Sequence, residues 1–132
     1  MTAPFIDTNI LVYLLTRDTA RIATAKSILA GGGIVSVQVL NELANVARRK
    51  SHLAMPELRG FLATIRGLVT VVPVTLAVHD LGLDICARYN YALYDSMLLA
   101  AAIQAGCDTF WTEDMQPGMR VLDTLVLQNP FR

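Results

Sequence analysis

The sequence predicts a single α/β domain with a mainly parallel central sheet sandwiched between helices. The chain has 132 residues, close to the usual size of one hydrophobic core. Short apolar runs alternate with longer helical stretches, an order typical of a parallel sheet. Hydrophobic residues make up 54% of the chain, which excludes a disordered protein. No repeat, linker or low-complexity tract divides the chain, so we expect one domain over residues 1–132.

The first half of the chain alternates twice between strand and helix. A polar turn separates the first strand from the first helix, and three glycines end the second helix. The second strand is short and apolar, as a buried strand should be. The expected segments are a strand at 4–6, helices at 10–15 and 18–30, a strand at 34–37 and a helix at 38–51.

The second half continues the same pattern and contains the most apolar helix. Pro56 stands in the first turn of a predicted helix, where proline is tolerated. The stretch from Tyr94 to Ala105 is almost wholly apolar and is closed by Gly106, so we expect it at the centre of the fold. The expected segments are helices at 55–67, 76–91 and 94–105 and strands at 69–74, 109–112 and 125–127.

Charge and cysteine content restrict the class of protein. Eleven basic and eleven acidic residues cancel, so any contact with nucleic acid must use a local patch. Cys86 and Cys107 lie far apart with no histidine nearby, which argues against zinc and favours reduced cysteines of a cytoplasmic protein. The longest charge-free runs are too short to span a bilayer, so we expect no membrane segment.

Four acidic residues stand out by their positions. Asp7 ends the first strand, and Asp114 follows the strand at 109–112. Glu42 lies one turn into the helix after the second strand, and Asp95 opens the apolar helix. In a parallel sheet the carboxyl ends of the strands meet at one edge, so all four carboxylates should converge there. Each residue taken alone could instead cap a helix or close a turn.

Clustered carboxylates repel one another, so this arrangement requires a cation. A site made of oxygen ligands without His or Cys favours Mg²⁺ or Mn²⁺. Such ions polarise a phosphoryl oxygen and activate water. Asn9, Ser96 and Thr112 are placed to orient a carboxylate or a water, although each could also cap its own helix.

Four short motifs resemble the signature blocks of the PIN-domain ribonucleases, and in particular the VapC toxins of bacterial toxin–antitoxin pairs. They occur in order over essentially the whole chain, which makes the resemblance specific. The blocks are Phe5-Ile6-Asp7-Thr8-Asn9-Ile10-Leu11, Asn41-Glu42-Leu43, Tyr94-Asp95-Ser96 with Leu98-Leu99-Ala100-Ala101-Ala102, and Thr112-Glu113-Asp114-Met115.

This resemblance implies a PIN-like fold and a Mg²⁺-dependent endoribonuclease that hydrolyses RNA with metal-activated water. It further implies a homodimer and inhibition by a cognate antitoxin. The metal-binding and catalytic residues would be Asp7, Glu42, Asp95 and Asp114, with Glu113 as an auxiliary acid.

Helical spacing suggests further contacts with RNA. In the helix predicted at 38–51, the side that should pack on the sheet carries Leu40, Leu43, Ala44 and Ala47. Another side of the same helix carries Glu42, Asn45 and Arg49. Arg49 then lies about 10 Å beyond Glu42, which suits a phosphate near the cleaved bond. Arg48 and Lys50 extend this basic run, which could equally complement the helix dipole.

Aromatic and apolar residues outside these motifs have simpler interpretations. Phe110 and Trp111, in a strand, are predicted to be core residues, and His52 and His79 to lie at the surface. Apolar residues between Leu53 and Leu68, with the early helices, could form a groove for an amphipathic antitoxin helix, or simply pack as an ordinary helix.

Two other functions remain open from the sequence. A PIN fold without activity could bind RNA or act as a scaffold, although such proteins usually lose the acids. Another Mg²⁺-dependent phosphoryl-transfer enzyme could also use aspartates at strand ends. An aspartyl phosphatase would need a second Asp where Asn9 stands and a late lysine, and no lysine follows Lys50.

Overall fold

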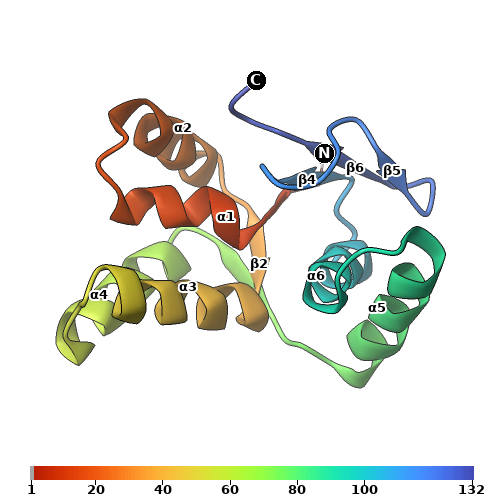
Figure 1. The fold of residues 1–132 in the computed structure, drawn as a ribbon, viewed down its shortest axis with the longest axis horizontal. Helices are drawn as coiled ribbons and strands as arrows, with labels where there is room; N and C mark the ends of the chain where they lie inside the picture. Colours follow the sequence, from red (N-terminus) through yellow and green to blue (C-terminus); the bar gives the residue numbers. More distant parts are fainter. Residues whose placement is uncertain (1) are drawn as a thin grey trace.

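The computed structural model describes residues 2–132, which form one six-stranded sheet with helices on both faces (Figure 1). The strands are β1 (Phe5–Ile6), β2 (Ile34–Ser36), β3 (Thr70–Val72), β4 (Thr109–Trp111), β5 (Arg120–Val121) and β6 (Leu125–Gln128). The helices are α1 (Thr8–Leu11), the 3₁₀ turn η1 (Val12–Leu15), α2 (Thr19–Ala30), α3 (Val37–Lys50), α4 (Met55–Arg66), α5 (Leu76–Tyr89) and α6 (Leu93–Gln104).

The sheet has the order β3-β2-β1-β4-β6-β5, and all neighbours are parallel except β5 and β6. Figure 1 shows α1 to α4 on one face of the sheet and α5 with α6 on the other. This arrangement confirms the predicted α/β class with a mainly parallel sheet. It also places the carboxyl ends of β1, β2 and β4 at one edge, where ligands of such folds bind.

The core lies on both faces of the short central strands. Phe5 and Phe110 pair across β1 and β4 and stack with ring centroids 5.2 Å apart. Ile6 and Trp111, one residue further along the same pair, project to the opposite face. Residues 96–102 of α6 are all buried, which confirms the prediction of a central apolar helix.

Several boundaries differ from those predicted. The helix predicted to reach residue 91 ends at Tyr89, because Asn90 adopts a left-handed conformation with φ of 58°. On α3 the fully buried residues are Val39, Leu43 and Ala47. Leu40 and Ala44, which were expected in that stripe, are only half-buried.

The strand predicted at 125–127 is confirmed as β6, but its hairpin partner β5 was not predicted. Thr124 N–H donates to the Val121 carbonyl, and the two residues between them, Leu122 and Asp123, have φ of 50° and 61°. Positive φ at both central positions is the type I′ turn, whose usual sequence is Asn-Gly or Asp-Gly. No helix within residues 2–132 is long and apolar enough to cross a bilayer.

Candidate active site

All four acidic residues singled out in the sequence line one hollow at the carboxyl edge of the sheet. The hollow has a volume of about 260 Å³. It is bounded by the start of α1, the middle of α3, the first turn of α6 and the loop after β4. The lining residues are Asp7, Thr8, Asn9, Val12, Glu42, Val46, Asp95 and Asp114.

Asp7 is the most buried of the four, with 5% of its surface exposed. One of its oxygens accepts hydrogen bonds from Thr112 Oγ1 at 2.8 Å and from Asn9 Nδ2 at 3.2 Å. The pKa of Asp7 is raised to about 7, mainly by burial and in part by the charges of Asp95 and Glu42, while hydrogen bonds from Thr112 and the Thr8 backbone oppose the shift. Without a cation, this carboxylate is held in an environment that disfavours its charge.

Glu42 is oriented by two side chains that sequence reasoning missed. Thr8 Oγ1 donates to Glu42 Oε1 at 2.7 Å, and Gln38 Nε2 donates to Oε2 at 3.4 Å. Gln38 also donates to the Tyr94 carbonyl at 3.0 Å, which ties the start of α3 to the start of α6. The spacing of Gln38 and Glu42, four residues apart on a helix, is the signal that could have revealed this pair.

Asp95 and Asp114 complete the rim of the hollow. Asp95 lies in the first turn of α6, whose N-cap is Ala92, so Asp95 is not the cap of this helix. Burial raises its pKa, and the charges of Glu42 and Asp114 add to the effect. Asp114 is exposed, and its backbone N–H donates to Thr112 Oγ1 at 3.3 Å. Thr112 therefore links the two strand-end aspartates.

The structure contains some of the supporting contacts predicted from the sequence and lacks others. Asn9 and Thr112 contact Asp7 as expected, and Asn9 Oδ1 also accepts from the Glu113 N–H at 3.2 Å. Ser96 does not orient a carboxylate: its Oγ is buried and has no hydrogen-bond partner within residues 2–132. Glu113 turns away from the hollow, and its Oε1 accepts from Tyr13 OH at 2.7 Å.

The basic run lies at the end of α3, the helix that carries Glu42. Arg48, Arg49 and Lys50 are all exposed, and none forms an ion pair within the described part of the chain. Phe110 is fully buried as predicted, whereas Trp111 is half-buried and lines a surface hollow. His52 and His79 are exposed, also as predicted.

The donor set of the acidic hollow suits a hard divalent cation. It offers carboxylate, hydroxyl and amide oxygens, with no His or Cys among the lining residues. Burial, together with the neighbouring carboxylates, raises the pKa of both Asp7 and Asp95, so their charged forms are disfavoured there. The four carboxylates line the same hollow, but no three Asp, Glu, His or Cys side chains in residues 2–132 lie close enough together to hold a metal ion.

Comparison with known proteins gives both a family and a fold. The PIN domain model matches residues 5–118. A crystal structure of Mycobacterium tuberculosis VapC20, described as a Sarcin-Ricin loop cleaving toxin, is 23% identical with a TM-score of 0.67, covering 85% of this chain and 90% of that one.

Two complexes have folds that are also similar to that of this chain. A toxin–antitoxin complex from Klebsiella pneumoniae is 21% identical with a TM-score of 0.70, over 98% of each chain. VapBC2 from Rickettsia felis, bound to a promoter DNA fragment, is 16% identical with a TM-score of 0.72, covering 97% of this chain and 98% of that one. A search of curated proteins gave no match. Because the family model spans most of the sequence and contains all four acids, the chain belongs to the PIN domain family.

Proposed function

We propose that the protein is a Mg²⁺-dependent endoribonuclease and the toxin of a toxin–antitoxin pair, with Mn²⁺ as an alternative cofactor. The observation that carries this proposal is the convergence of Asp7, Glu42, Asp95 and Asp114 on one open hollow. All four acids are present, and the hollow opens to solvent rather than being sealed in the core. The similarity to VapC20, a toxin that cleaves RNA, supports the same reaction class.

In this proposal the four carboxylates hold the cation and the surrounding side chains fix their directions. Thr112 and Asn9 both donate to Asp7 Oδ2, which fixes the orientation of this carboxylate. Thr8 and Gln38 hold Glu42 above the hollow. When bound, a divalent cation polarises the phosphodiester and lowers the pKa of water, which makes hydrolysis feasible at neutral pH.

RNA would run along α3, from the hollow toward the end of the helix. Seven residues separate Glu42 from Arg49, which corresponds to about 10 Å along the helix axis. Arg48, Arg49 and Lys50 are exposed and have no ion-pair partner in residues 2–132, so they are free to contact phosphates. These basic side chains would position the RNA backbone rather than recognise particular bases.

An antitoxin helix would occupy an apolar groove between α2 and α4. This groove, the α2–α4 groove, has a volume of about 420 Å³. Its apolar lining matches the region expected from the sequence, and the similar structures from Klebsiella pneumoniae and Rickettsia felis are toxin–antitoxin complexes. The lining residues are Leu14, Lys26, Leu29, Ala30, Phe61, Thr64, Ile65 and Leu68.

A homodimer would cover exposed apolar side chains near the carboxyl ends of β2 and β3. Val37 and Val74 follow strands whose ends pair at Ser36 and Val72, and both are more than a third exposed. Leu76, nearby at the start of α5, is 75% exposed. Exposed apolar side chains gathered in this way are typical of a protein interface.

The test is RNA cleavage by the purified protein, freed of any antitoxin. We expect internal cuts with Mg²⁺ or Mn²⁺, none in EDTA, and products with a 5′-phosphate and a 3′-hydroxyl. Asp7→Asn and Asp95→Asn should each reduce the rate roughly a hundredfold or more, because several kcal/mol of charge stabilisation is lost. Asp84→Asn, at an exposed acid on α5, is the matched control and should cleave normally. Cleavage that survives both EDTA and Asp95→Asn would refute the proposal.

A further inference from the structure

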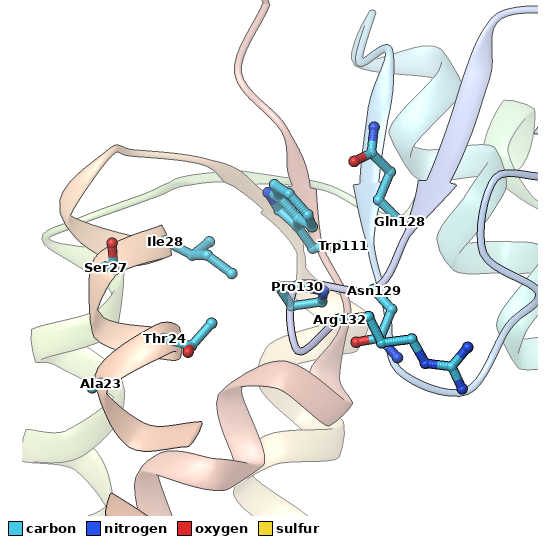
Figure 2. Close-up of a pocket in the computed structure, with 9 residues that line it drawn as sticks. All are labelled: Ala23, Thr24, Ser27, Ile28, Trp111, Gln128, Asn129, Pro130 and Arg132. Atoms are coloured by element: carbon cyan, nitrogen blue, oxygen red, sulfur yellow. The ribbon is translucent and has the colours of Figure 1, made fainter. Parts of the chain in front are cut away.

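A second hollow lies beside the acidic one and differs from it in chemistry. It has a volume of about 510 Å³ and is formed between α2 and the segment after β6 (Figure 2). We call it the Trp111 hollow. It is lined by Ala23, Thr24, Ser27, Ile28, Trp111, Gln128, Asn129, Pro130 and Arg132.

The wall of this hollow combines one large aromatic side chain with uncharged polar groups. Figure 2 shows Trp111 beside Ile28 of α2, with Gln128 on the neighbouring strand. Gln128 is exposed and makes no side-chain hydrogen bond within residues 2–132. Asn129 Oδ1 accepts from the Phe131 N–H at 2.9 Å, which leaves the amide nitrogen of Asn129 available as a donor. Proteins bind unpaired nucleobases by stacking the base on an aromatic ring and forming hydrogen bonds to its edge, and this hollow has both kinds of group.

The side chains that line the Trp111 hollow include no carboxylate. The one charged side chain among them is that of Arg132. An adjoining hollow of about 320 Å³ shares Thr24, Pro130 and Arg132 and adds Arg21. The Arg21 guanidinium forms an ion pair with Asp18 at 3.2 Å and lies 5.5 Å from the centre of the Tyr13 ring and 5.2 Å from that of Phe131. Because Asp18 already neutralises Arg21, Arg132 is the arginine of this surface that a phosphate would contact.

Residues of the Trp111 hollow are neighbours in sequence and in the sheet of residues that hold the acidic hollow. Trp111 immediately precedes Thr112, which holds Asp7, and Trp111 pairs with Ile6 immediately before Asp7. A chain of contacts also connects the two hollows: the Phe131 ring meets the Tyr13 ring edge to face at 5.1 Å, Tyr13 OH donates to Glu113, and the Glu113 N–H donates to Asn9 of the acidic hollow.

We propose that the Trp111 hollow is a nucleobase subsite, in which an unpaired base of the RNA substrate stacks on Trp111 beside the cleaved phosphodiester. This inference rests on the proposed ribonuclease function and adds to it a preference for single-stranded RNA. The amides of Gln128 and Asn129 bind the edge of the base, and Arg132 binds a flanking phosphate. Stacking on an indole tolerates every base, so the subsite selects unpaired structure more than sequence.

Trp111 is the only tryptophan of the chain, so its fluorescence reports on this hollow alone. The experiment uses the Asp95→Asn protein, a short single-stranded RNA, and a matched oligomer with abasic nucleotides that keeps the phosphates. We expect RNA to protect Trp111 from quenching by acrylamide and the abasic oligomer to protect it much less. Trp111→Leu should weaken RNA binding about tenfold, within the range for loss of one stacked base.

A second pair of variants separates base contact from phosphate contact. Gln128→Ala should weaken RNA binding several-fold without changing its salt dependence, whereas Gln116→Ala, an exposed glutamine outside the hollow, should have no effect. If RNA binds and is cut by the wild type while Trp111 stays equally accessible and Gln128→Ala is neutral, the subsite is refuted and the nuclease stands. If RNA is neither bound nor cut, both proposals fall.

Discussion

The acidic hollow and the α2–α4 groove are of comparable size, about 260 and 420 Å³, but their walls have opposite chemistry. The acidic hollow places four carboxylates around a small space, supported by hydrogen bonds from Thr112, Asn9 and Thr8. The α2–α4 groove is lined mainly by leucine, isoleucine and phenylalanine side chains, with a single lysine and threonine. The acidic hollow thus has the chemistry that suits a cation, and the α2–α4 groove has the chemistry that suits an apolar partner.

The two surfaces reduce stability by different mechanisms. In the acidic hollow the cost is electrostatic, since burial and mutual repulsion disfavour the ionised forms of Asp7 and Asp95. That cost depends on pH and disappears when a cation neutralises the charges. In the groove the cost is exposed apolar area, as at Leu68, which is 48% exposed. That cost is independent of pH and disappears only when another apolar surface covers it.

The largest effect should come from removing the buried charge at Asp7. Its folded-state pKa of about 7 lies above the ordinary value of 3.8, so between these values the folded protein binds more protons than the unfolded one. The metal-free protein should therefore lose stability as pH rises from about 4 to 7, by a few kcal/mol at most. Asp7→Asn should flatten this dependence and raise Tm at neutral pH, as measured by calorimetry in EDTA.

Mg²⁺ supplies the internal control for this measurement. Millimolar Mg²⁺ should raise the Tm of the wild type and have much less effect on Asp7→Asn, because the cation stabilises only the protein that binds it. Asp84→Asn, which changes an exposed acid, should behave as the wild type in both conditions. A wild-type Tm that is constant from pH 4 to 7 without metal would show that Asp7 carries no electrostatic cost.

The second prediction concerns the α2–α4 groove, at Leu68. Leu68→Asp places a charge in the apolar groove and should weaken antitoxin binding about tenfold or more. Leu68 is about half exposed, so the free energy of unfolding should fall by less than about 1 kcal/mol. Leu83→Asp is the matched control, because Leu83 is 46% exposed but lies on α5, across the sheet. Titration calorimetry against the antitoxin should separate the two variants, and equal affinities would place the antitoxin elsewhere.

The sequence predicted the acidic hollow better than its surroundings, for a physical reason. Asp7 and Asp114 follow strands whose ends are marked by apolar runs, so their position at the sheet edge follows from topology alone. The contacts of Thr8 with Glu42 and of Tyr13 with Glu113 span 34 and 100 residues. Such long-range pairs depend on how helices dock, which local patterns do not encode.

The same reasoning explains two errors. Ser96 was expected to orient a carboxylate because it follows Asp95, but consecutive residues on a helix face different directions, and its hydroxyl lies buried in α6. The β5–β6 hairpin was missed because Leu122 and Asp123 adopt positive φ without the glycine that usually marks such a turn. In both regions the conformation is determined by tertiary packing rather than by the local preferences of the sequence.

The third prediction tests whether the acidic hollow extends into a phosphate-binding surface along α3. Arg49→Ala should reduce RNA affinity several-fold and flatten its salt dependence by about one unit, equally for different RNA sequences. Arg59→Ala, at an exposed arginine on α4, is the control. Salt titrations with the inactive Asp95→Asn protein measure both slopes. An unchanged slope would leave Arg49 with only the role of complementing the helix dipole.

The last prediction concerns η1, where the acidic hollow and the α2–α4 groove meet, and its effect on RNA cleavage should be the smallest. Tyr13 donates to Glu113, whose N–H contacts Asn9 of the acidic hollow, whereas the next residue, Leu14, lines the α2–α4 groove. Tyr13→Phe removes one hydrogen bond and leaves Glu113 without a partner for either oxygen, at a cost of about 1–3 kcal/mol in stability. Because Tyr13 reaches Asp7 only through Glu113 and Asn9, we expect RNA cleavage to fall by less than about tenfold, an indirect loss smaller than one transition-state contact.

Leu14→Met is the matched variant, since it keeps the volume of the side chain and changes only the groove. It should leave cleavage unchanged and alter antitoxin affinity slightly, the reverse of Tyr13→Phe. Steady-state cleavage rates and antitoxin titrations on the same two proteins measure both quantities. If each variant changes both, then η1 couples the groove to the hollow, and an antitoxin bound between α2 and α4 could act on the carboxylates through this turn. If each changes only its own surface, inhibition requires that the antitoxin reach the acidic hollow itself.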